Sequence, residues 1–336
     1  MHNLPLVSVI IPNYNHAKYL DRRLQTVLNQ TYPNFEVWIL DDKSTDNSLE
    51  VIAKYEDNPH VAGIVVNEVN SGSPFKQWRK GMELAKGDFV WIAESDDYCE
   101  LTFLERMMAA HKRYRDAVVL YCYIEMVDEN GTPWSRHKSC NPVPIFSKNG
   151  LCIENLKEWG RYAVRSFKFR TQHISGKSYM KRFLSMYCSI ENASGAVFKR
   201  EVALNIEPYY LNMKGAGDYM FWTQMAERGN VVFLHETLSY CRRHDGVITN
   251  KYNSDGSNMM DEMFVQNYIR NIVHISPLRK RLIRAYHAYK IERIQFSTKE
   301  IQQQIYRVWN VPDNSKLDEM LLSVWFWLKT YIVFYV

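Results

Sequence analysis

The sequence predicts an α/β protein built on a mostly parallel sheet that is flanked by helices. Over residues 1–125, short β-branched runs alternate with segments whose apolar residues recur at helical spacing. Such alternation is typical of strand–helix–strand units, which place helices on both faces of a sheet. A length of 336 residues with 46% apolar and 24% charged side chains is enough for a sizeable core and argues against disorder.

The expected elements follow one another along the first part of the chain. The expected strands cover residues 6–12, 35–42, 61–67, 88–94 and 117–125. The expected helices cover residues 17–30, 47–56, 76–86 and 102–114. Ser44 or Asp46 can cap the second of these helices.

The second part of the chain is less regular. Turn signals at Asn130, Pro142 and Pro144 predict that residues 126–190 form an irregular insertion that covers one side of the sheet. A strand and the start of a helix are expected at 193–201, an amphipathic helix at 219–229 and a strand at 231–244. Most of the remainder is expected to be helical.

Polar side chains gather where the expected strands end. In open parallel sheets, ligands bind beyond the carboxyl ends of the strands. The segments that follow the first four strands are residues 12–15, 41–46, 70–73 and 94–97, and three of the four are rich in Asp or Asn. This repetition predicts a site at that edge of the sheet.

The stretch WIAESDDYCE, residues 91–100, places Glu94, Asp96 and Asp97 at the end of a buried strand. Asp97 can cap the helix that starts near Thr102, or two of the carboxylates can form an acid–base pair. The third interpretation is a Mg²⁺ or Mn²⁺ site shared with the phosphates of a substrate. It best explains the clustered like charges, because a divalent ion neutralises them together with a diphosphate.

Later residues bear on this choice. Asp218, in KGAGDYMFW, stands at the start of an amphipathic helix, where an aspartate is often an N-cap. His244, in CRRHDG, follows a strand end, where a lone histidine is usually just exposed. Lys76, Trp78 and Arg79 follow the SGS turn, and either contact phosphate or form a solvated helix face with Trp78 in the core.

The segment VSVIIPNYNHAKYLDRRLQTVLNQTYPNFEVWILDDKSTDNS resembles the opening of the family 2 glycosyltransferases, which are inverting enzymes with the GT-A fold. PNYN, NQTYPNFE and the DD-STD turn stand in the order and spacing of that family. The segment NSGSPFKQWRKGMELAKGDFVWIAESDD continues the match through a DxD-type motif. ASGAVFKRE, GAGDYMFW and CRRHDG match more loosely. The chain departs from the family's usual pattern at Glu94, often Asp, and at Gly217, usually acidic.

The resemblance implies a role for each candidate residue. Asp42 would accept hydrogen bonds from the nucleotide base. The donor nucleotide would contact a set of residues at the strand ends: Pro12, Tyr14, Asn15, Asp42, Ser71, Lys76 and Asp96. Mn²⁺ or Mg²⁺ on the diphosphate would be held by Asp97, Asp96 and His244. Asp218 would be the general base for the acceptor hydroxyl, and Glu94 would orient the two aspartates.

The expected function is metal-dependent, inverting transfer of a sugar from a nucleotide-sugar donor, with a UDP-sugar favoured. The acceptor would be a hydroxyl of a saccharide or lipid-linked saccharide, in cell-surface polysaccharide synthesis. Residues 1–250 would be the catalytic domain, with a nucleotide-binding half (1–123) and an acceptor-side half with the insertion (124–250), and residues 251–336 a helical extension. The alternative is a catalytically inactive nucleotide-sugar or saccharide-binding protein on the same fold.

Three other enzyme classes fit the sequence less well. A dinucleotide-dependent oxidoreductase needs a glycine-rich turn after the first strand, where this chain has PNYN. A nucleotidyltransferase typically carries a glycine-rich, basic N-terminal loop, which this chain lacks. A phosphatase that uses DDKST as its nucleophile would leave SDD and GAGD unexplained.

Charge and cysteine usage set expectations about partners and location. Residues 279–293 hold six Lys or Arg against Glu292, and the net charge is +5. The aromatic and aliphatic tail 323–336 is too short to span a bilayer. Together with residues 279–293 it suits contact with an anionic membrane surface. The alternative is that the tail forms a buried terminal helix and residues 279–293 form a solvated basic face. No nucleic-acid partner is expected. Six scattered cysteines without a CxxC pair, and no visible leader, predict a cytoplasmic protein, peripheral at the inner face of the membrane if the tail binds lipid.

Overall fold

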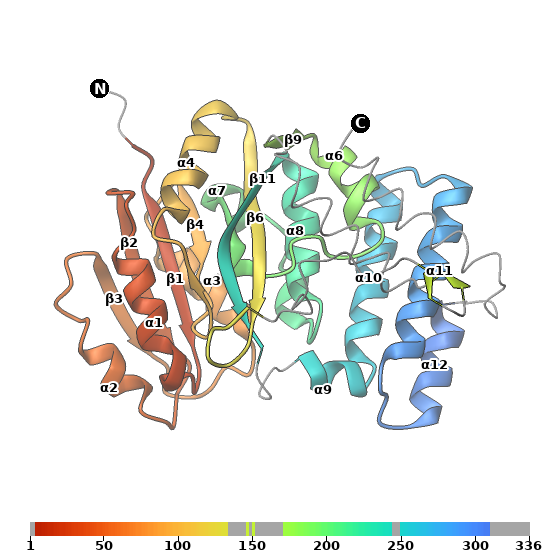
Figure 1. The fold of residues 1–336 in the computed structure, drawn as a ribbon, viewed down its shortest axis with the longest axis horizontal. Helices are drawn as coiled ribbons and strands as arrows, with labels where there is room; N and C mark the ends of the chain where they lie inside the picture. The colour runs from red at the N-terminus through yellow and green to blue at the C-terminus, as the bar shows by residue number, and fades with distance from the viewer. Residues whose placement is uncertain (1–3, 134–145, 148–149, 152–170, 244–248, 310–336) are drawn as a thin grey trace. The chain divides into compact units, whose positions relative to one another are not determined.

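Figure 1 shows the fold in a computed structural model, which describes residues 4–133, 146–147, 150–151, 171–243 and 249–309. The chain divides into two compact units. The first comprises Met1–Trp134 and Thr171–Val247, and the second comprises Ser135–Arg170 and Ile248–Val336. The functional division into residues 1–123, 124–250 and 251–336 stays a prediction.

The first unit is built on one mixed sheet, whose described strands lie in the order β3-β2-β1-β4-β10-β6-β11-β5, with β9 also paired to β11. β3, β2, β1 and β4 are parallel neighbours, as are β6 and β11, whereas β10, β5 and β9 pair antiparallel. The strands are β1 Val7–Asn13, β2 Phe35–Asp41, β3 Val61–Val66, β4 Phe89–Ile92, β5 Tyr98–Cys99, β6 Ala117–Val127, β9 Gln172–Ile174, β10 Ala196–Lys199 and β11 Asn230–Arg242. The predicted α/β class with a mostly parallel sheet is confirmed.

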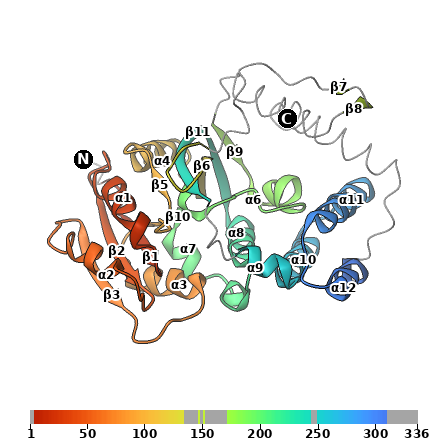
Figure 2. The same cartoon turned by 60° about the horizontal axis from the view of Figure 1, so that its bottom comes forward.

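Helices cover both faces of this sheet (Figure 2). One face packs against α1 Ala17–Leu28, α2 Ser48–Ala53 and α4 Phe103–Arg113. The opposite face packs against α3 Pro74–Leu84, α7 Arg200–Leu204 and α8 Gly217–Arg228. Successive side chains of β1 point to opposite faces of the sheet. Val9 packs in the core under α1. Ile10 packs against α3, and a Cβ added at Gly81 would lie 2.4 Å from the Ile10 Cγ2 atom.

The elements expected as far as residue 125 all form, with shifts of a few residues at their ends. The largest difference at the site is that β4 ends at Ile92 instead of residue 94. Beyond it the chain turns, and the Asp97 N–H donates to the Glu94 carbonyl over 3.2 Å. About half of the expected insertion at 126–190 lies outside the described residues, and its described part includes the short helix α6 Gly176–Tyr179. The 3₁₀ turn Ala193–Gly195 follows it.

The second unit is helical where it is described, apart from the short pair β7 Phe146–Ser147 and β8 Gly150–Leu151. Its helices are α9 Thr249–Ser254, α10 Ser257–Ile272, α11 Pro277–Arg293 and α12 Lys299–Trp309. The shared core of α10, α11 and α12 is formed by Met259, Ile291, Ile305 and Trp309. None of the helices in the described ranges is both long and apolar enough to cross a membrane.

Candidate active site

The carboxyl ends of β1 and β2 meet in register, with Asn13 opposite Asp41. The Asn13 carboxamide donates to Oδ2 of Asp41 over 2.8 Å. Asp41 also accepts hydrogen bonds from the backbone N–H of Ser44, over 2.8 Å, and from its hydroxyl, over 2.6 Å. Asp41 therefore fixes the turn that carries Asp42, and Lys43 in this turn adopts a left-handed φ of 67°.

Asp42 is 5% exposed, and the polar groups that donate to its carboxylate are called here the Asp42 cup. Its Oδ1 accepts from the Asn67 carboxamide over 2.6 Å, the Ser71 N–H over 2.8 Å and the Gln77 carboxamide over 2.9 Å. Its Oδ2 accepts from the Ser71 hydroxyl over 2.7 Å. All four donors are neutral groups, so the contacts described for this carboxylate include no cationic partner.

The other residues expected to contact the nucleotide surround this cup in different ways. Pro12 is buried within β1, and Tyr14 is exposed beside it. Asn15 has a left-handed φ of 56°, and its carboxamide oxygen accepts from the Thr45 N–H over 2.7 Å, so this side chain braces the turn. Lys76 is exposed, and its Nζ donates to the Ser71 carbonyl over 3.0 Å.

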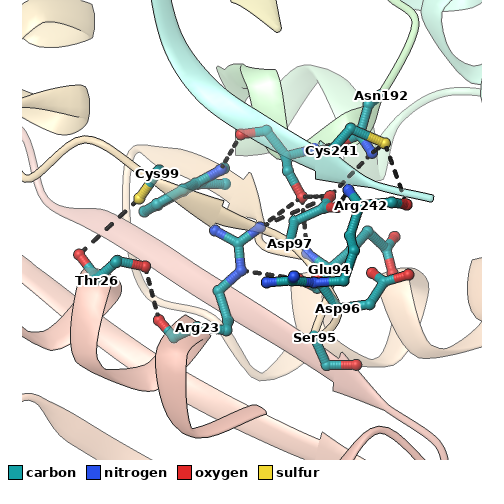
Figure 3. Close-up of polar contacts among 12 residues, drawn as sticks. Arg23, Thr26, Glu94, Ser95, Asp96, Asp97, Cys99, Asn192, Cys241 and Arg242 are labelled. Atoms are coloured by element: carbon teal, nitrogen blue, oxygen red, sulfur yellow. Dashed lines mark hydrogen bonds and ion pairs between the residues drawn. The ribbon is translucent and has the colours of Figure 1, made fainter. Parts of the chain in front are cut away.

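Asp97 lies in a second, more deeply buried cluster and is 1% exposed (Figure 3). Its Oδ2 accepts from the Asn192 carboxamide over 2.9 Å and from the Ser194 hydroxyl over 2.7 Å. Its Oδ1 accepts from the backbone N–H of Arg242 over 3.0 Å. None of these donors belongs to α4, so the interpretation of Asp97 as the cap of that helix is wrong.

Two buried arginines fix the acidic loop, residues 94–97 (Figure 3). Arg23 donates from Nε to the Glu94 carbonyl over 2.8 Å, and its Nη2 lies 3.8 Å from Oδ2 of Asp97. Arg242 donates from Nε to the Asp96 carbonyl over 2.9 Å. Burial raises the pKa of Asp97, and the Asp96 carboxylate adds to that rise, whereas Arg23 opposes it.

The two other carboxylates of the acidic loop are half-buried. Oε1 of Glu94 accepts from the indole N–H of Trp78 over 2.9 Å. Burial, together with the charge of Asp96, raises the pKa of Glu94 to about 8. Trp78 is 3% exposed, so of its two predicted placements the core is confirmed.

Asp218 lies in the first turn of α8 and is half-buried. Its Oδ1 accepts from the N–H of Tyr219 over 2.7 Å. Ala216 occupies the N-cap position, so Asp218 is not the N-cap of this helix. His244 lies outside the described residues, and its predicted role stays a prediction.

A divalent ion fits these residues only if a substrate shares it. The described residues contain no group of three or more His, Cys, Asp or Glu side chains placed to hold a metal ion. Asp97 accepts from three protein donors and is 1% exposed, whereas Asp96 is half-buried and therefore more accessible to an ion. Mg²⁺ is commonly bound by one or two carboxylates plus substrate phosphates, and this donor set suits that mode.

Four residues of the site were missed by reasoning from sequence, namely Arg23, Asn192, Ser194 and Arg242. Arg23 carried a usable signal, because it lies on the apolar face of α1 with Leu20 and Val27, where a charged group needs a partner. Asn192 and Ser194 gave none, since their contacts with Asp97 span nearly 100 positions of the chain and depend on the antiparallel placement of β10.

Part of this chain is similar in sequence to known proteins. Residues 8–203 match the family model described as glycosyl transferase family 2. The chondroitin synthase of Pasteurella multocida is 35% identical over 176 residues, which are 52% of this chain and only 17% of that protein. The poly(ribitol-phosphate) beta-N-acetylglucosaminyltransferase TarS of Staphylococcus aureus is 34% identical over 137 residues, 40% of this chain and 24% of that protein.

Solved structures share the fold. The crystal structure of S. aureus TarS 1-349 in complex with UDP-GlcNAc has a TM-score of 0.65 at 20% identity, covering 97% of this chain and 89% of that one. The mannosyltransferase PcManGT from Pyrobaculum calidifontis, in complex with GDP-Man and Mn²⁺, has a TM-score of 0.53 at 14% identity, covering 99% and 83%. These matches confirm the predicted GT-A type of α/β fold. Because the family model spans more than half of the sequence, the chain belongs to glycosyl transferase family 2.

Proposed function

We propose that the protein transfers a sugar from a nucleotide-sugar donor, with a UDP-sugar favoured, to a hydroxyl of a saccharide or lipid-linked saccharide, in cell-surface polysaccharide synthesis. The observation that carries the proposal is the meeting of Asp42 and the acidic loop at the carboxyl ends of β2 and β4, the two strands that flank β1. This edge is where open α/β sheets bind nucleotides. UDP-GlcNAc and GDP-Man in the named structures support a nucleotide-sugar donor.

The Asp42 cup would bind the nucleotide base. A carboxylate oxygen can accept two hydrogen bonds, so Oδ2 of Asp42 would accept an N–H of the base beside the Ser71 hydroxyl or in its place. That hydroxyl also lies 3.2 Å from the Ser73 carbonyl, so it has a second acceptor at hand. Ser71 would turn to Ser73 as the base enters, and no buried donor would lose its partner.

The acidic loop would lie at the diphosphate. Asp96 would be the carboxylate that meets the metal or the ribose, with His244 as a further ligand from outside the described residues. Asp97, first expected as the main metal ligand, would mainly hold the loop through its three protein donors, and Glu94 would orient Asp96. Mn²⁺ or Mg²⁺ bound there would offset the negative charge that develops on the departing nucleoside diphosphate.

Asp218 would be the general base. Its carboxylate would take the proton of the acceptor hydroxyl as that oxygen attacks the anomeric carbon and the bond to the nucleoside diphosphate breaks. A single displacement of this kind inverts the anomeric centre. The first turn of α8 favours the negative form of the carboxylate before the proton arrives.

A donor screen tests this proposal. Release of nucleoside diphosphate would be measured for UDP- and GDP-sugars with Mn²⁺, with Mg²⁺ and with a chelator. We expect turnover with one donor class, loss with chelator, and a fall of about 10²–10⁴-fold for Asp218→Asn. The matched control is Asp57→Asn, at an exposed aspartate beyond α2. Donor binding without turnover by the unsubstituted protein would instead support the inactive binding protein.

We also propose that α11 contacts an anionic membrane surface mainly through charge. Its apolar residues Leu282 and Ile283 are buried, while Lys280 and Arg284 are exposed, together with Leu278 in its first turn. An exposed basic residue near such a surface contributes about 1 kcal/mol. Sedimentation with anionic vesicles should therefore fall at high salt and in the Lys280→Glu/Arg284→Glu variant, and equal binding to neutral vesicles would contradict the proposal. The predicted contribution of residues 323–336 lies outside the described residues.

A further inference from the structure

An aromatic pair on α3 contacts the acidic loop. The indole N–H of Trp78 donates to Oε1 of Glu94 over 2.9 Å. Phe75, one turn earlier, meets the Trp78 ring edge to face, with centroids 5.2 Å apart and planes at 85°. Phe75 is 6% exposed and Trp78 3%, so both rings are held in place by packing.

The same two rings contact the start of α8. The backbone of Gly217 packs directly on the Phe75 ring, and a Cβ at residue 217 would lie 2.4 Å from its Cε2 atom. One turn further along α8, the Phe221 ring meets Trp78 edge to face, with centroids 5.7 Å apart. Residue 218, next to Gly217, is the proposed base.

We propose that Phe75 and Trp78 are positioning residues that hold the acidic loop and the first turn of α8 in register, and so fix Asp218 relative to the bound donor. The inference rests on the proposed function and deepens it. α3 contributes no reacting group in this arrangement. It links the acidic loop to α8, through the hydrogen bond from Trp78 to Glu94 and the packing of the Phe75 ring on Gly217.

This link matters because Asp218 must reach the acceptor hydroxyl while the donor is bound at the Asp42 cup and the acidic loop. A misplacement of about 1 Å between groups that react can cost about 100-fold in rate. A shift of α8 should therefore lower turnover, and should leave binding of the nucleoside diphosphate unchanged, because the Asp42 cup does not include α8.

The test compares two alanine substitutions at the ends of α8. Gly217→Ala pushes the helix start away from Phe75. Gly229→Ala is the matched control, because its Cβ would lie 2.3 Å from Val118 Cγ1 at the other end of the same helix. We expect Gly217→Ala to lower kcat for nucleoside diphosphate release about 10- to 100-fold. The affinities for UDP and GDP, measured by calorimetry, should stay within about twofold, and Gly229→Ala should change Tm more than kcat.

A second substitution distinguishes a loss of positioning from a general loss of folding. Replacing Phe75 by Leu in the Gly217→Ala background removes the colliding ring edge, so we expect most of the lost kcat to return. At the other contact, Trp78→Phe removes the indole donor and Glu94→Leu removes the acceptor, so each breaks the same hydrogen bond. Their effects on kcat should therefore combine to no more than the larger single effect.

The outcomes separate this inference from the proposed function. Three results would each overturn the positioning role while wild-type turnover upholds the function. They are equal kcat losses for Gly217→Ala and Gly229→Ala, no rescue by Phe75→Leu, and additive effects of Trp78→Phe and Glu94→Leu. If the unsubstituted protein releases no nucleoside diphosphate from any donor, the proposed function fails and the positioning role fails with it.

Discussion

Asp42 and Asp97 are both buried aspartates that follow β2 and β4, the two strands that flank β1, yet they are held in different ways. The donors to Asp42 are the side chains of Asn67 and Gln77 and two groups of Ser71, all neutral. Ser71 is half-buried and has an alternative acceptor. The Ser71 hydroxyl can therefore move from Asp42 to the Ser73 carbonyl with little loss of free energy.

Asp97 is instead tied to distant parts of the chain. Its donors Asn192, Ser194 and Arg242 lie beyond residue 190, and the guanidinium of Arg23 lies 3.8 Å away. Loss of any of these contacts leaves a buried charge or polar group without its partner. The comparison indicates that a buried acid at a strand end is suited to ligand binding when its donors are replaceable and no cation pairs with it. It is suited to a structural role when its donors come from distant segments and a buried cation pairs with it.

The largest effect that follows is on stability. Asp97→Ala leaves Arg23, which is fully buried, without a carboxylate partner. Removing one member of a buried ion pair typically costs about 3–5 kcal/mol of unfolding free energy. We expect a marked fall in Tm by circular dichroism.

The double variant Asp97→Leu/Arg23→Met controls for this loss. Because it removes both charges, it should regain much of the stability that Asp97→Ala loses. A Tm for Asp97→Ala equal to that of wild type would show that Asp97 is not a structural anchor, and would return it to the role of metal ligand.

A smaller effect on stability, coupled to a large effect on binding, is expected for Asp42→Ala. The carboxamides of Asn67 and Gln77 lose an acceptor, at a cost of about 1–3 kcal/mol. The affinity for UDP should fall about tenfold or more, since a charged acceptor contributes about 1.5–3 kcal/mol to a hydrogen bond. Calorimetric titration measures both nucleotides, and unchanged affinity for UDP and GDP would place the base elsewhere.

The sequence was enough to predict the strand ends, because hydrophobic periodicity located β1, β2 and β4 and parallel strands bring their carboxyl ends together. Asn13, Asp41 and Asp42 accordingly meet as expected. Periodicity carries no information about partners from later strands. The role of Asp97 therefore escaped prediction, since its donors reach it only after β10 and β11 have added to the sheet.

The departure from the family's usual residue at Gly217 has a physical reason that only the structure reveals. The Phe75 ring fills the space that a side chain at residue 217 would need. Glu94 likewise has a partner in Trp78, six residues before the end of α3. The resemblance to the family marks both residues as unusual, but the reason lies in contacts between α3, the acidic loop and α8.

The smallest expected effect is the sharpest test of the exchangeable site at Asp42. Ser71→Ala removes the hydroxyl whose place the base would take and keeps the Ser71 N–H that donates to Oδ1. We expect a stability loss of about 1 kcal/mol. The affinity for UDP should stay equal or rise up to a few-fold, because the exchange from Asp42 to Ser73 is no longer needed. Gln77→Ala, which removes a donor that does not have to leave, is the matched control and should weaken binding. If Ser71→Ala weakens UDP binding as much as Gln77→Ala does, the hydroxyl contacts the nucleotide directly and the exchange does not occur.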